Sequence, residues 1–161
     1  MRKWFSKTQT VAIDSPLEGR SVPLEQVPDE AFAQKMMGDG VAIEPASGRL
    51  TAPFDGKIAH LIDTRHAVIV EHDSGLQVLL HIGINTVALG GRGFAAHVRT
   101  GDRVRSGQLL IEFDPKAIAE AGFRPITPVV IANEDIAAGV ERKYGAVREN
   151  EKAILKVSLK T

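Results

Sequence analysis

The sequence of 161 residues contains no cysteine. This absence excludes disulfide frameworks, thiolate zinc sites and cysteine nucleophiles. An excess of either charge is also absent, because 20 Lys and Arg balance 20 Asp and Glu. Nucleic-acid-binding domains usually carry a basic excess, so nucleic acid is not an expected partner. No uninterrupted apolar run exceeds four residues, the length of residues 67–70. A membrane-spanning helix needs about 20, so none is predicted.

The N-terminal segment lacks the apolar core of a secretion signal. Trp4 and Phe5 lie among basic residues, but residues 6–10 are polar. We therefore expect a cytoplasmic protein with a short basic tail at residues 1–9, whose two aromatic rings give at most weak peripheral contact with a membrane. Residues 10–161 are expected to form a single domain, because 43% hydrophobic side chains suffice for one core.

Fifteen glycines and eight prolines divide the chain into short segments. Runs rich in β-branched residues and bounded by Gly, Pro, Asp or Asn predict strands. These runs are residues 10–13, 41–43, 67–71, 76–82, 109–113, 129–133 and 153–159. Capping and breaking residues predict three short helices, at residues 28–35, 114–121 and 133–144. Short strands at this spacing favour a β-sandwich or barrel over βαβ units.

Two hexapeptides, SPLEGR at residues 15–20 and APFDGK at residues 52–57, match in residue class at every position. Each predicts a turn that leads into a strand, with its glycine free to adopt positive φ. The match indicates an internal repeat of a β-unit, although six positions can also agree by chance.

With cysteine absent, the histidines are the candidates for reactive chemistry. For His60, His72 and His97 we expect ordinary surface or core positions. His66 and His81 flank a predicted hairpin with Asp-Ser-Gly turn chemistry.

If the hairpin turns about Asp73 and Ser74, His66 lies directly across from His81 on the partner strand. Alternation in the second strand places Leu76, Val78, Leu80 and Ile82 on the core face and both histidines on the opposite, more open face. Such a pair of imidazoles suits three roles: ligands of a metal, a general base with its orienting partner, or a nucleophile whose neighbour holds a transferred anion.

At this hairpin the sequence resembles a known family. The stretches TRHA at residues 64–67 and LLHIGINTV at residues 79–87 are similar to the signature of the glucose-family enzyme IIA of the bacterial sugar phosphotransferase system. Further motifs follow in order, so that the resemblance covers about residues 11–160. They are VPD at 27–29, FA at 32–33, GDGVAI at 38–43, AP-x-DG at 52–56, G-x-GF at 91–94, IEFD at 111–114 and TPVV at 127–130.

The resemblance implies an antiparallel β-sandwich of the duplicated-hybrid-motif type with a few short helices. It implies a histidine phosphocarrier that accepts a phosphoryl group from phospho-HPr and passes it to a cysteine on the IIB domain of a sugar permease, for uptake and phosphorylation of glucose or a related sugar. By motif, His81 is the phosphorylated nucleophile, His66 a donor that stabilises the phosphoryl group, Thr64 a nearby hydroxyl, and Gly83 the carbonyl that binds the nucleophile's ring. No cofactor is required.

The resemblance also implies a docking surface of apolar side chains around the histidines. Its expected members are Phe32, Met36, Met37, Ile62, Leu79 and Val87. Regulatory partners are further candidates, and in such a complex His66 and His81 could bind zinc with a partner's carboxylate. Two positions depart from the family's pattern: Asn85 replaces a common Asp and weakens a negative rim, and Arg65 replaces a neutral residue.

Two other scaffolds have similar glycine-punctuated strands. A LytM-type zinc peptidase requires a His-x-His pair, which the sequence does not contain. A biotinyl- or lipoyl-type carrier resembles residues 101–108, but it requires a lysine at a hairpin tip that is missing here. The phosphocarrier is therefore the favoured function.

Overall fold

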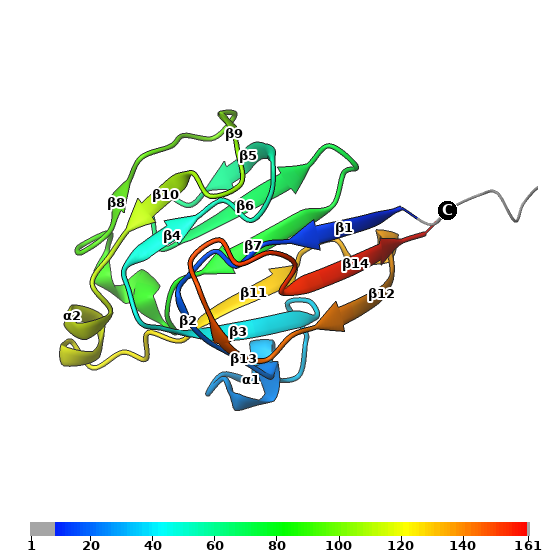
Figure 1. Cartoon of the computed structure of the whole chain (residues 1–161). Coiled ribbons are helices and arrows are strands. Elements are labelled where there is room, and N and C mark those ends of the chain that lie inside the picture. The colour runs from blue at the N-terminus through cyan, green and yellow to red at the C-terminus, as the bar shows by residue number, and fades with distance from the viewer. Residues whose placement is uncertain (1–8, 161) are drawn as a thin grey trace, which may run out of the picture.

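The computed structural model describes residues 9–160, which fold mainly into antiparallel strands (Figure 1). Eight strands form the largest sheet, in the order β13-β2-β3-β11-β7-β6-β5-β9. In that order they span Gly145–Val147, Gly19–Val22, Gly40–Pro45, Thr127–Ile131, Gln77–His81, Ala67–His72, Gly56–Leu61 and Arg103–Val104. Two three-stranded sheets have the orders β1-β14-β12 and β4-β10-β8. Their strands span Thr10–Ile13, Leu155–Leu159 and Ala137–Arg142, and Arg49–Thr51, Leu109–Glu112 and Ala95–Ala96.

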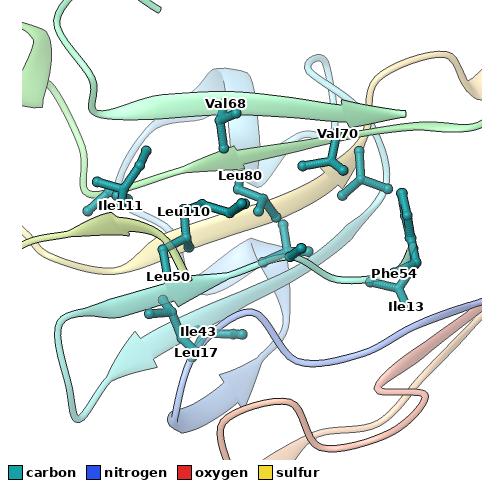
Figure 2. Packing of buried hydrophobic residues seen from close by; sticks show 14 of the residues in the cluster. Ile13, Leu17, Ile43, Leu50, Phe54, Val68, Val70, Leu80, Leu110 and Ile111 are labelled. Carbon is teal, nitrogen blue, oxygen red and sulfur yellow. The ribbon is translucent and has the colours of Figure 1, made fainter. Parts of the chain in front are cut away.

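The main hydrophobic core lies between the large sheet and the two smaller ones, which confirms the predicted β-sandwich. Ile43 on β3 and Leu80 on β7 belong to the same cluster as Leu50 on β4, Leu110 on β10 and Ile13 on β1 (Figure 2). All five side chains are fully buried. Close packing on this scale makes the large sheet a rigid platform for its other face.

Helices α1 (Glu30–Ala33) and α2 (Pro115–Glu120) lie inside the first two predicted helices. Their capping residues are Asp29 and Asp114, whose carboxylates accept the backbone N–H two residues on, at 2.8 and 2.9 Å. In the described residues, the 3-10 turns η2, η3 and η4 span Leu24–Gln26, Thr86–Leu89 and Glu134–Ile136.

The predicted helix at residues 133–144 is wrong. After the turn η4, the segment becomes strand β12, which pairs with β14. The register shifts between Ala137 and Gly139, so the strand carries a bulge beside this glycine. Pairing with a buried neighbour strand thus overrides the segment's local preference.

Strand β7 is buried on both faces. The prediction for its core face is confirmed, because Val78 and Leu80 belong to the main cluster and are fully buried. The opposite face is less open than predicted. Leu79 is only 7% exposed and packs in a second cluster with Phe32 and Ile84, on the side of the sheet that carries α1. Phe32 of this second cluster lies against the ring of His81.

The two matching hexapeptides lead into β2 and β5, each second from an end of the large sheet. This placement supports the repeat. The reason predicted for their glycines is wrong, because neither Gly19 nor Gly56 has positive φ. Instead, a Cβ at Gly19 would lie 2.0 Å from the Glu44 carbonyl oxygen, and one at Gly56 would lie 2.2 Å from that of Glu71. Each glycine permits close approach of the neighbouring strand.

Gly56→Ala is expected to destabilise the fold by about 2 kcal/mol or more, because a backbone carbonyl must move to admit the methyl group. Urea unfolding measures this loss. Gly139→Ala is the matched control in β12, where a Cβ would meet no atom within 4 Å. Equal stability of the two variants would contradict the close-approach account.

The predicted tail at residues 1–9 lies outside the described residues except for Gln9. The carbonyl of Gln9 already accepts a hydrogen bond from Leu159 N at 2.8 Å. In the described part of the chain, no helix is long and apolar enough to cross a membrane.

Candidate functional site

The predicted pairing of His66 with His81 is wrong by one residue. Strands β6 and β7 pair with Ala67 opposite His81. The hairpin loop has three residues, 73–75, and its last residue, Gly75, has φ of 97°. A three-residue loop that ends in a left-handed glycine is a common alternative to the two-residue turn, and it shifts every opposed pair by one.

The two imidazoles nevertheless meet, because His66 reaches His81 from a turn rather than from the ladder. Arg65, at φ of 59°, ends that turn and donates its N–H to the Ile62 carbonyl at 2.7 Å. The His66 carbonyl then accepts the N–H of Ile82 at 2.7 Å, which holds the two chain segments together. The ring centroids lie 5.0 Å apart, with the planes at 81°.

The ring of His81 is fixed by a backbone carbonyl. Its Nδ1 lies 2.8 Å from the Gly83 oxygen. A carbonyl oxygen only accepts hydrogen bonds, so Nδ1 carries the proton and Nε2 of the neutral ring keeps its lone pair. The Phe32 ring lies against His81 with centroids 5.2 Å apart. The site therefore presents one imidazole in a single tautomer, with Nε2 as its free nucleophilic atom.

His66 is held from two sides. Its Nδ1 lies 2.8 Å from the Thr64 hydroxyl oxygen, which can donate to it or accept from it. The Phe94 ring lies 6.4 Å from the His66 ring, on a segment far from the hairpin in sequence. The side chain is buried, at 4% exposure, so the prediction that both histidines lie on an open face holds only for the half-buried His81.

Both histidines are kept neutral near pH 7. Burial, followed by the charge of His81, lowers the pKa of His66 from 6.5 to about 4. Burial also lowers the pKa of His81 below 6.5, while the Gly83 carbonyl and the Asp29 carboxylate act in the opposite direction. A neutral imidazole is what a nucleophile requires, and lowered pKa values at paired groups are typical of functional sites.

The pKa of His66 is about 4 in the folded chain and 6.5 as a free side chain. As the pH falls, His66 is therefore protonated in the unfolded state at a higher pH than in the folded state. The stability associated with neutral His66 is complete above pH 6.5 and is lost toward pH 4, by about 3 kcal/mol. Urea unfolding of wild type and His66→Gln at pH 7.0 and 4.5 checks this. The wild type should lose more stability than the variant; equal losses would exclude His66 as the source.

The predicted docking residues divide into two groups. Met36, Met37 and Val87 are exposed by 72%, 44% and 58%. Ile62 is partly buried and packs against the second cluster. Phe32 and Leu79 are buried, so their assignment to an exposed surface is corrected: both belong to the second cluster, and Phe32 lies against the His81 ring.

The other histidines lie in ordinary environments, as predicted. His72 packs edge-on against Phe54, and His97 pairs with Glu112 at 2.7 Å. The side chain of exposed Arg65 lies over the Gly91 backbone. A Cβ added at Gly91 would lie 3.1 Å from Nη2 of Arg65. Within residues 9–160, no group of three or more His, Cys, Asp or Glu could hold a metal ion.

Two residues of the site were not singled out from the sequence. Phe94 ends the G-x-GF motif, and Thr86 lies inside the LLHIGINTV stretch. The signal for Thr86 was a hydroxyl residue four positions after Ile82, whose carbonyl it binds at 2.5 Å. The signal for Phe94 lies only in the three-dimensional approach of its loop to His66.

Residues 11–137 match the family described as the phosphoenolpyruvate-dependent sugar phosphotransferase system, EIIA 1. The chain belongs to this family. EIIA components are phosphotransferase proteins of sugar transport, in agreement with the resemblance found in the sequence.

Relatives support the EIIA assignment. The chain is 44% identical over 148 residues to the glucose-specific EIIA component of Oceanobacillus iheyensis, covering 91% of this chain and 90% of that protein. It is 46% identical over 138 residues to the glucose-specific EIICBA component of Staphylococcus saprophyticus, covering 85% of this chain and 20% of that protein. Glucose permease IIA from Mycoplasma capricolum superposes with a TM-score of 0.86 at 32% identity, covering 91% and 96% of the two chains.

Proposed function

We propose that Nε2 of His81 accepts a phosphoryl group from phospho-HPr and passes it to a cysteine of a IIB domain. The observation that carries this proposal is the 2.8 Å contact between His81 Nδ1 and the Gly83 oxygen, which leaves Nε2 as the free lone pair. Phosphoryl transfer needs an in-line nucleophile and charge stabilisation rather than further covalent chemistry, so the imidazole pair suffices without metal or nucleotide.

In the accepting step, the lone pair of His81 Nε2 forms a bond to phosphorus as the P–N bond of phospho-HPr breaks. The proton stays on His81 Nδ1, which continues to donate to the Gly83 oxygen, and the resulting positive ring faces the negative phosphoryl group. The pKa of His81 lies below 6.5, which keeps the nucleophile neutral when the donor arrives.

In the donating step, a IIB thiolate attacks phosphorus and the P–N bond to His81 breaks. His66 serves as the donor opposite the phosphoryl oxygens. We assign the Thr64 hydroxyl as donor to His66 Nδ1 across their 2.8 Å contact, which leaves Nε2–H of His66 free to bind a phosphoryl oxygen. Thr64 is thus a positioning residue, and its hydroxyl is engaged by His66 rather than aimed directly at phosphate.

Both partners bind in turn over the same surface. Exposed Met36, Met37 and Val87, with Ile62 at the edge, supply its apolar contacts. Methionine side chains repack easily, which suits a face that fits two different proteins. Fusion of A, B and C components in one relative supports a IIB domain as the acceptor.

The names of the relatives favour glucose or a related sugar as the transported substrate. Cytoplasmic partners imply that the carrier is cytoplasmic.

Incubation with enzyme I, HPr and labelled phosphoenolpyruvate tests the proposal. Label should appear on this chain only when HPr is present, should be labile to acid and stable to base, and should move to an added IIB domain. Label that arrives without HPr, or that stays on this chain with IIB domains of glucose-type permeases, would contradict it.

A further inference from the structure

The turn that follows His81 is closed by the side chain of Thr86. This threonine is fully buried, and its hydroxyl donates to the Ile82 carbonyl oxygen at 2.5 Å. Within the described part of the chain, that carbonyl accepts no other hydrogen bond. A buried carbonyl without a partner is costly, so the hydroxyl has a definite structural task.

Ile82 connects this hydroxyl to both histidines. It directly follows His81 in the chain, and its N–H donates to the His66 carbonyl at 2.7 Å. The Thr86 hydroxyl therefore fixes Ile82, which is bonded covalently to His81 and hydrogen-bonded to the backbone of His66.

The methyl group of Thr86 lies close to Gly83, the residue that follows Ile82. Gly83 adopts φ of 75°, and a Cβ there would lie 2.5 Å from Thr86 Cγ2 and 3.0 Å from the Arg124 oxygen. The Ile84 N–H donates to the same Arg124 oxygen at 2.9 Å. Gly83 is thus enclosed, with its carbonyl turned toward His81 Nδ1.

We propose that Thr86 is a positioning residue that sets the tautomer of His81 through the Ile82–Gly83 turn. Without the hydroxyl, the Ile82 carbonyl turns toward another donor and carries the adjoining peptide with it. The Gly83 oxygen then leaves Nδ1, and His81 populates both neutral tautomers, of which only one has its lone pair at Nε2. This inference rests on the proposed role of His81, but its spectroscopic test does not require phosphoryl transfer.

The test compares Thr86→Val, which keeps the shape, with Thr86→Ser, which keeps the hydroxyl. Side-chain ¹H–¹⁵N correlation spectra report the tautomer of His81 directly. Wild type and Thr86→Ser should show Nδ1–H alone, and Thr86→Val a mixture. Acceptance from saturating phospho-HPr should slow about ten- to a hundredfold in Thr86→Val, with an unchanged KM for phospho-HPr, because the nucleophile is misplaced.

Thr51→Val is the control, since it removes another fully buried hydroxyl–carbonyl contact, to Pro16, on β4. It should leave the His81 spectrum unchanged. A single Nδ1–H tautomer of His81 in folded Thr86→Val would overturn the proposal. A mixture of tautomers in Thr86→Ser would also overturn it. The serine variant therefore tests the proposal even if the valine variant does not fold. Absence of label on wild-type His81 would instead refute the proposed function and leave the tautomer result standing.

Discussion

His81→Ala is expected to abolish phosphorylation of the chain by phospho-HPr. Among residues 9–160, His81 has the only imidazole whose Nδ1 is bound to a carbonyl and whose Nε2 thereby keeps its lone pair, and the variant lacks this ring. His66 cannot replace it, because its Nδ1 is engaged by Thr64 and its ring is buried at 4% exposure. Transfer of label from phosphoenolpyruvate through HPr, followed by acid hydrolysis, measures the loss.

Circular dichroism and thermal unfolding control for misfolding of His81→Ala, since the side chain is only half-buried. Acid-labile label in the folded variant, on His66 or on the exposed His60 or His97, would overturn the assignment. Label on none of them, with a wild-type unfolding curve, is the expected result.

His66→Ala is expected to accept a phosphoryl group from phospho-HPr but to donate it poorly to a IIB domain. Acceptance needs the free nitrogen and fixed tautomer of His81, and Gly83 supplies the latter. Donation needs charge stabilisation on the phosphoryl oxygens as the imidazole leaves. Loss of one preorganised donor costs on the order of 3 kcal/mol, or about a hundredfold in rate. Rapid-quench transfer in each direction separates the two steps.

His66→Gln is the matched variant, because its amide N–H lies in a similar place and should retain part of the donating rate. If His66→Ala loses acceptance as completely as His81→Ala, the two histidines act as one unit and the division of roles is wrong. Equal donation rates in His66→Ala and wild type would exclude His66 as a donor to the phosphoryl group.

Much of the fold could be predicted from the sequence, since buried strands carry continuous β-branched runs. Strand β1 begins and ends at the predicted residues, and β6, β7, β10, β11 and β14 overlap their predictions closely. The missed strands are two or three residues long, as in β8 and β9, or carry charged residues, as in β12. Their pairing depends on neighbours distant in the chain, which local patterns do not encode.

The site illustrates the same limit. The motif around His81 identified the two histidines, whereas the register argument for their pairing failed at a three-residue loop that local composition could not distinguish from a two-residue turn. Burial of Phe32 and Leu79 depends on α1 folding over the sheet, and the approach of Phe94 depends on a separate loop. None of these contacts can be predicted from the local sequence of one strand or helix, because each joins residues far apart in the chain.

The nitrogen that carries phosphorus is the most direct test of the central claim. The Gly83 carbonyl holds the proton on His81 Nδ1, so phosphorus should be attached to Nε2. ³¹P NMR of the chain phosphorylated by phospho-HPr, with ¹H–¹⁵N spectra of its histidine side chains, distinguishes the two ring positions and the residue. A single phosphohistidine with phosphorus on Nε2 of His81 is the predicted result. Phosphorus on Nδ1 of His81, or on any other histidine, would contradict the account.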